Sequence, residues 1–103
     1  MTRQLLPARR SSQTFKFEHV NPSGHVFDYT ATVGYYDDGR PGEVFLSSSK
    51  LSTDQDISAS EAAILLSFAL QHGASFAAIR TAMIRGEDGK PHGVIGTLCD
   101  LLA

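Results

Sequence analysis

The chain has 103 residues, of which 42% are apolar and 19% are charged. This is the composition of one globular domain, and it excludes a disordered or fibrous chain. The net charge of −2 offers no general attraction to nucleic acid or to an anionic membrane. A single cysteine excludes both an intrachain disulfide and a cysteine-based zinc site. No apolar run approaches the roughly 20 residues of a membrane helix, so we expect a soluble, cytoplasmic protein with no membrane contact.

The N-terminal residues differ from the rest of the chain. Residues 1–12 hold three arginines and no acidic residue, and their apolar residues show little periodicity. We interpret them as a flexible basic tail, which precedes a single domain over residues 13–103.

Apolar and polar residues alternate along three short segments of the first half of the chain. In the first segment, Phe15 and Phe17 are separated by a charged residue, which is the period of a strand with one buried face. β-Branched and aromatic residues dominate the second segment, and turns rich in glycine, proline and aspartate separate the three. The predicted strands cover residues 13–19, 26–36 and 43–47. Short turns between consecutive strands indicate an antiparallel β-meander.

The hydrophobic period changes in the second half of the chain. Ser58 and Glu61 have the spacing of a capping box, which begins a helix. The residues that follow are apolar on nearly all sides, which predicts a helix buried on more than one face. The predicted helices lie between Ser58 and Gly73, between Ser75 and Arg85, and over residues 93–102. The order indicates an α+β fold, in which a three-stranded meander is followed by three helices packed on one face.

A polar loop before the first helix is the candidate ligand site. Residues 47–53 read Ser-Ser-Ser-Lys-Leu-Ser-Thr and lack the glycines of a phosphate-binding loop. Lys50, Ser52 and Thr53 nevertheless precede a helix start, where backbone N–H groups favour an anion. With Arg40 added, these side chains form a candidate site for a small ligand or a nucleotide phosphate.

The first two predicted helices also have the order of a helix-turn-helix reader, whose second helix enters a major groove. That second helix offers Arg80, Thr81 and Arg85, which are few for base and phosphate contacts. The net negative charge disfavours binding to nucleic acid. A helix-turn-helix DNA-binding protein therefore stands as an alternative.

No catalytic set of side chains emerges. The four histidines lack metal-ligand spacing, and we expect them on the surface or in turns. Cys99 has no cationic neighbour in the sequence that would lower its pKa, and its apolar neighbours favour a packed thiol. We therefore assign no catalytic residue, no metal site and no cofactor, and we expect no enzymatic activity.

Three segments carry a resemblance to a known family. Residues 34–46, which include Gly-Arg-Pro-Gly-Glu-Val-Phe, are followed by Lys50. Residues 62–73 end in Leu-Gln-His-Gly, and residues 95–102 contain Ile-Gly and Asp-Leu-Leu. Together they resemble the TSCPD domain, which is found at the C-terminal end of adenosylcobalamin-dependent ribonucleotide reductases and as small stand-alone proteins. The resemblance covers roughly residues 13–103.

The chain departs from that family at the namesake motif. Residues 96–100 read Gly-Thr-Leu-Cys-Asp, in which only Asp100 is in register with Thr-Ser-Cys-Pro-Asp and Cys99 is displaced by one position. A thiol or metal role of the motif therefore does not carry over. These 103 residues also lack the catalytic barrel with its radical cysteine. The resemblance implies a non-catalytic accessory module that acts through contacts with a reductase-type protein.

Self-association is the second partner hypothesis. A small sheet has open edges that must be blunted or paired, and the first helix is apolar on nearly all sides. Both features favour a homodimer formed by sheet or helix packing.

Overall fold

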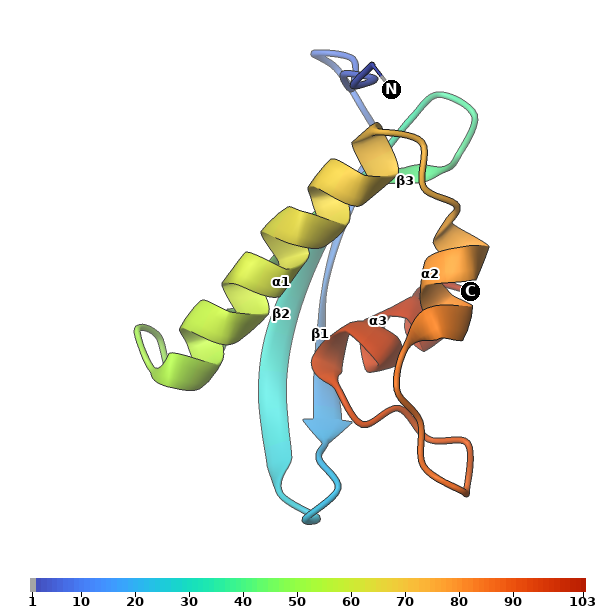
Figure 1. Cartoon of the computed structure of the whole chain (residues 1–103). Coiled ribbons are helices and arrows are strands. Elements are labelled where there is room, and N and C mark those ends of the chain that lie inside the picture. The colour runs from blue at the N-terminus through green and yellow to red at the C-terminus, as the bar shows by residue number, and fades with distance from the viewer. Residues whose placement is uncertain (1) are drawn as a thin grey trace.

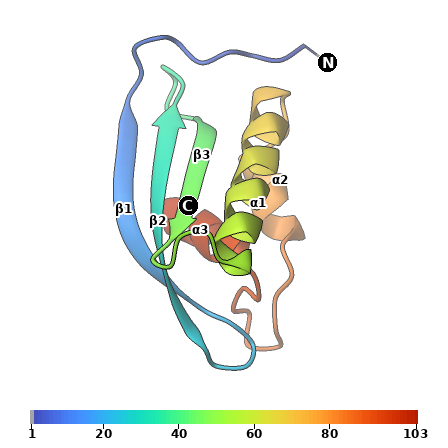
Figure 2. The same cartoon turned by 90° about the vertical axis from the view of Figure 1, so that its left-hand side faces the viewer.

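The computed structural model describes residues 2–103 as an antiparallel sheet followed by three helices (Figure 1). The strands are β1 (Ser12–Val20), β2 (Val26–Tyr35) and β3 (Pro41–Ser48), and the helices are α1 (Asp54–Gln71), α2 (Phe76–Ala82) and α3 (Val94–Leu102). The strand order is β1-β2-β3, and all three helices lie on one side of the sheet (Figure 2). The predicted α+β class and β-meander are confirmed.

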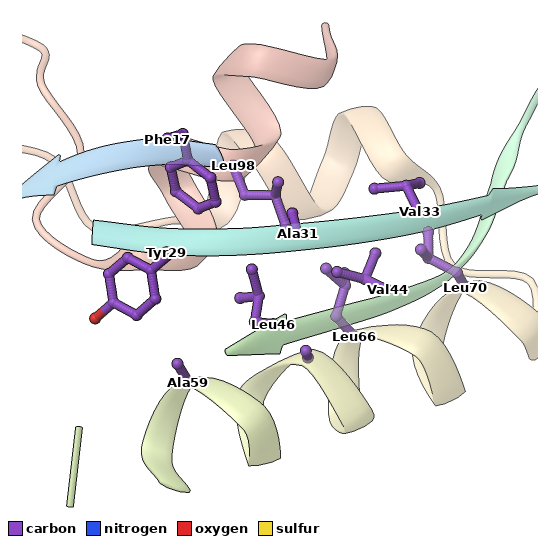
Figure 3. Close-up of a cluster of buried hydrophobic side chains, with 11 residues drawn as sticks. Phe17, Tyr29, Ala31, Val33, Val44, Leu46, Ala59, Leu66, Leu70 and Leu98 are labelled. Atoms are coloured by element: carbon purple, nitrogen blue, oxygen red, sulfur yellow. The ribbon is translucent and has the colours of Figure 1, made fainter. Parts of the chain in front are cut away.

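Period-two alternation decides which strand residues face the helices. Phe17 of β1 lies opposite Tyr29 of β2, and Val33 of β2 lies opposite Val44 of β3, so these side chains share one face of the sheet. Leu98 of α3 is fully buried among them (Figure 3). The buried apolar cluster comprises Phe17, Tyr29, Ala31, Val33, Val44, Leu46, Ala59, Ala63, Leu66, Leu70 and Leu98.

Helix α1 begins five residues earlier than the sequence indicated. The N-cap is Thr53, whose hydroxyl oxygen accepts a hydrogen bond from the backbone N–H of Asp56. The predicted capping box of Ser58 and Glu61 is therefore wrong, since both residues lie inside the helix. The predicted end is confirmed, because Gly73 follows the C-cap with a φ of 94°, a conformation that favours glycine.

Helix α2 is shorter than predicted. It ends at Ala82, whereas the sequence indicated a helix through Arg85. Met83 is extended, and Arg85 forms an isolated antiparallel bridge with Pro91. The chain therefore leaves α2 in a short hairpin-like loop before α3, and α2 has only seven residues.

Two serines of α1 form hydrogen bonds with the backbone at the outer edge of β3. Ser67 Oγ accepts from the Val44 N–H at 2.8 Å and lies 3.1 Å from the Val44 carbonyl oxygen. Ser60 Oγ donates to the Leu46 carbonyl at 3.0 Å. Because an unpaired strand edge is a template for pairing with another chain, these contacts remove β3 from the available sheet edges.

The other face of the sheet carries no helix (Figure 2). Its outward side chains are mainly polar and include Lys16, Glu18 and Asp28, which are exposed. Thr14 and Thr32 pair across it through their hydroxyls at 3.0 Å, and Phe45 is its exposed aromatic residue. This face differs from the outer surface of α1, which is apolar.

The N-terminal segment runs past the C-terminal end of α1. The Gln4 N–H donates to the Gln71 carbonyl, and the Tyr36 hydroxyl donates to the Gln4 carbonyl, both at 2.6 Å. Residue 1 lies outside the described residues. The flexibility expected of residues 1–12 stays a prediction, but this segment places Arg3 beside α1.

Candidate interaction surface

The solvent side of α1 carries a row of large apolar side chains. Ile57, Ile64, Leu65 and Phe68 are 49%, 51%, 71% and 47% exposed, respectively. Their spacing of three, four and seven residues places them on one side of a helix with 3.6 residues per turn. We call these four residues the α1 outer face.

The opposite side of α1 is the one that packs on the sheet. Ala59, Ala63, Leu66 and Leu70 are buried there, about half a turn away from the outer face. A helix that is apolar all round is normally buried all round. The prediction that this helix is buried on more than one face is wrong for the single chain, because sheet and helices of the same chain cover only one of its faces.

An apolar groove lies between α1 and the start of α3. Ala62 of α1, Met83 and Ile84 after α2, and Val94 and Ile95 of α3 line it. Its volume of about 580 Å³ falls within the range of small-molecule pockets, but its lining offers few polar groups that would orient a ligand. Such a groove is better suited to apolar side chains of a protein.

Charged groups of opposite sign stand at the two ends of the α1 outer face. Asp54 lies in the first turn of α1 and is exposed. At the other end, the Arg3 guanidinium lies 4.8 Å from the centre of the Phe68 ring, and its Nε donates to Gln71 Oε1 at 2.6 Å. Within residues 2–103, neither Asp54 nor Arg3 forms an ion pair. Glu61 is the acidic residue in the middle of the face.

The predicted anion loop is occupied by a side chain of the protein itself. Asp56 accepts from the N–H of Ser48 at 2.8 Å and from the N–H of Ser52 at 2.9 Å. These two hydrogen bonds lower the pKa of Asp56. Thr53 is engaged as the N-cap and donates to the Lys50 carbonyl. A phosphate that bound the amides of Ser48 and Ser52 would have to displace the Asp56 carboxylate.

The structure does not bring Arg40 to that loop. Arg40 lies in the turn before β3, whereas Lys50 follows the end of β3, so the length of the strand separates them. Arg40 donates to Asp38 at 2.6 Å and lies 4.8 Å from the centre of the Tyr36 ring. The four predicted ligand residues therefore occupy two separate places in the fold.

Two arginines that the sequence offered for DNA contacts are paired within the chain. Arg80 Nε donates to Asp100 at 2.9 Å, and the Arg85 guanidinium donates to both oxygens of the same carboxylate at 2.8 and 2.9 Å. Hydrogen bonds from Arg85 and then from Arg80 hold the pKa of Asp100 well below its usual range. Asp100, the one residue in register with the family motif, thus ties α2 and the following loop to α3.

The buried histidine and the cysteine are packed inside the fold. His19 is buried, which corrects the expectation that all four histidines lie on the surface or in turns. Its Nε2–H donates to the His92 carbonyl at 3.1 Å, so its Nδ1 accepts from the Thr97 hydroxyl at 2.8 Å. Cys99 is buried as predicted, and burial raises the pKa of its thiol. Among residues 2–103, no three His, Cys, Asp or Glu residues come together as metal ligands.

Comparisons with known proteins identified no relative that would indicate the function. No protein-family model matches the chain, and searches of curated proteins and of solved structures found no match. Within the described part of the chain, no helix has both the length and the apolar character of a membrane span. The α1 outer face gathers four exposed large apolar residues on one helix, which the sequence indicated only as an unusually apolar helix.

Proposed function

We propose that the protein is a non-catalytic interaction module that acts through protein–protein contacts, and that the α1 outer face is its contact surface. The observation that carries this proposal is a group of four large, exposed apolar side chains on one side of a well-formed helix, interrupted by Glu61 and next to an apolar groove. Monomeric proteins rarely expose larger apolar patches than a few hundred Å², and larger patches mark interaction sites.

The resemblance to the TSCPD domain supports association with a ribonucleotide reductase. Two of its motifs contact each other in the fold: Gln71, from Leu-Gln-His-Gly, donates through Nε2 to the carbonyl of Gly42, from Gly-Arg-Pro-Gly, at 2.9 Å. Gln71 is buried although it is polar. The motifs therefore have a shared structural reason to occur together, which joins the end of α1 to the β2–β3 turn. On this basis we infer an accessory module of a reductase-type protein.

The two alternatives have less support. For a nucleotide-phosphate site, the backbone amides of Ser48 and Ser52 before α1 already bind Asp56, and Arg40 lies elsewhere. A thermal shift with millimolar inorganic phosphate or nucleotide tests it, because a ligand of the native state raises the melting temperature. For a DNA reader, Arg80 and Arg85 are held by Asp100. Binding to DNA that falls steeply with salt would be its signature.

Sedimentation analysis tests the proposed function. The purified chain is run alone and mixed with a purified adenosylcobalamin-dependent reductase, next to two variants of matched chemistry. Leu65→Glu places a charge on the α1 outer face, and Leu101→Glu places the same charge on an exposed leucine of α3. We expect a protein complex, with itself or with the reductase, that Leu65→Glu abolishes and Leu101→Glu retains. Monomers in every mixture, or equal binding by both variants, would contradict the proposal.

A further inference from the structure

We propose that the α1 outer face binds a second copy of this chain, with the two α1 helices packed antiparallel about a two-fold axis. This inference rests on the proposed function, since it names the partner of the same surface. A two-fold dimer requires a self-complementary surface, in which residue i contacts residue j and j contacts i. The charged groups at the two ends of the α1 outer face, Asp54 and Arg3, and its apolar residues meet that requirement.

The charges favour an antiparallel pair. Asp54 stands at the first turn, Arg3 stands beside the last turns, and neither forms an ion pair within residues 2–103. Antiparallel packing places Asp54 of each copy next to Arg3 of the other, so two complementary contacts form at once. Parallel packing would instead place like charges together at both ends. The helix dipoles also oppose each other only in the antiparallel arrangement.

The apolar residues fix the position of the two-fold axis. The outer face extends from Ile57 to Phe68, which is about 16 Å along the helix at roughly 1.5 Å per residue. Its midpoint lies between Ala62 and Ala63. An axis at that midpoint places Ile57 of one copy against Phe68 of the other, and leaves Ile64 and Leu65 at the centre.

Glu61 is the side chain that works against this dimer. Under the same two-fold axis, the two Glu61 residues lie only about 4.5 Å apart along the helix direction. Their carboxylates would repel each other, and their stems would cover Ile64 of the partner. Replacing the carboxylate by a neutral amide of the same shape therefore has a predictable direction: Glu61→Gln tightens the dimer.

The size of the surface predicts a moderate affinity. A standard stable interface takes roughly 800 Å² from each partner, and four side chains with the adjacent groove provide only part of that area. We therefore expect a dissociation constant on the order of micromolar, so that dilution dissociates the dimer.

Concentration-dependent sedimentation of the full chain tests the dimer. We expect the wild type to shift from dimer to monomer on dilution, Leu65→Glu to stay monomeric, and the control Leu101→Glu to follow the wild type. Glu61→Gln should shift the midpoint to a severalfold lower concentration. A dimer that survives Leu65→Glu, for example through the edge of β1, overturns the inference.

Disulfide cross-linking tests the direction of packing. With helices about 8–10 Å apart, the two copies of residue 61 come within the Cα separation of roughly 4.4–6.8 Å that a disulfide needs. The two copies of residue 54 lie about 25 Å apart. Under mild oxidation, Glu61→Cys should cross-link to itself and Asp54→Cys should not, while the native Cys99 is buried and does not compete. Cross-linking of both variants indicates parallel packing and overturns the inference, as does cross-linking of neither in a dimer.

A charge exchange tests the end contacts independently. Arg3→Glu and Asp54→Arg should each weaken the dimer by about three- to tenfold, and the double variant should restore it, because the charges are then exchanged but still complementary. Urea unfolding of each variant checks that the fold is retained. Additive weakening in the double variant contradicts the proposed contact.

The outcomes separate this inference from the proposed function. If the chain alone is monomeric at every concentration but binds the reductase through Leu65, the dimer is wrong and the proposed function stands. If neither complex forms, both are wrong.

Discussion

Replacing His19 with phenylalanine tests the contact that holds α3 and its preceding loop on the sheet. The imidazole of β1 bonds the Thr97 hydroxyl at 2.8 Å and the His92 carbonyl at 3.1 Å, and it is 4% exposed. Phenylalanine keeps a ring of similar size but removes both hydrogen bonds. His92 and Gly93 line the groove beside α1, so the same contact shapes the proposed interaction surface.

The expected cost follows from the two groups left without a partner. A buried donor or acceptor that loses its partner costs roughly 1–3 kcal/mol. Thr97 is half-buried and His92 is exposed, so water can partly replace the ring nitrogens. We therefore expect His19→Phe to lower the free energy of unfolding by about 2 kcal/mol at pH 7.5. For a chain of this length, that corresponds to a melting temperature lower by roughly 10 °C.

The pH dependence of this loss has a definite sign. Burial lowers the pKa of His19 from its ordinary value of 6.5, so the unfolded chain takes up the proton more readily than the folded chain. The stability contributed by neutral His19 is present above pH 6.5 and is lost as the pH falls through the lower pKa of the folded state. The phenylalanine variant lacks this proton, so the difference between wild type and variant shrinks on acidification.

Urea unfolding of both proteins between pH 7.5 and pH 5 measures the effect. The exposed His25 supplies the control, because His25→Phe should change stability by less than about 0.5 kcal/mol. A loss below about 0.5 kcal/mol for His19→Phe, or a loss of constant size across this pH range, would refute the structural role given to His19.

Three further predictions concern the helices. Thr53→Ala should lower the free energy of unfolding by about 1 kcal/mol in urea unfolding, because it removes the N-cap of α1, whereas Ser58→Ala should be neutral. A larger loss for Ser58→Ala than for Thr53→Ala would instead support the capping box of Ser58 and Glu61. Gly96→Ala should lower the melting temperature, because its Cβ would lie 2.7 Å from the Cβ of Pro91. The free energy of unfolding should fall by about 1–2 kcal/mol even though alanine favours a helix. A stabilised variant would contradict this packing. Cys99 should react with a thiol reagent at pH 7.5 only after urea unfolding, because its thiol is buried and its pKa is raised; rapid reaction of the native protein would show that α3 opens.

Local patterns were sufficient for much of the fold. The alternation of β1 and β2 identified which residues share a face, because period two is a property of the backbone itself. The Asp-Gly turn before β3 and Gly73 after α1 were readable for the same reason, and both glycines have positive φ angles, of 88° at Gly39 and 94° at Gly73.

Local sequence patterns could not identify the residue at which α1 begins. Thr53 with Asp56 and Ser58 with Glu61 both have capping spacing. The structure selects the first pair, because the Asp56 carboxylate also bonds the backbone at the end of β3. That contact depends on where the strand and the helix meet, and residue spacing contains no information on it.

Contacts between side chains that lie far apart in the chain could not be predicted from the sequence either. His19 has partners more than 70 residues away in the chain, and Asp100 binds arginines 15 and 20 residues before it. The ligand site placed on Lys50 and Arg40 joined residues that the length of β3 keeps apart. Such pairs become visible only when the elements are packed against each other.

The α1 outer face likewise depends partly on the sequence and partly on the tertiary structure. Sequence alone indicated that α1 is apolar on nearly all sides, and it therefore predicted that the helix is buried on more than one face. Only the tertiary structure decided which side of the helix stays exposed. The sheet can cover one side of a straight helix, and Ala59 and Ala63 allow close approach there, so Ile64, Leu65 and Phe68 remain in solvent.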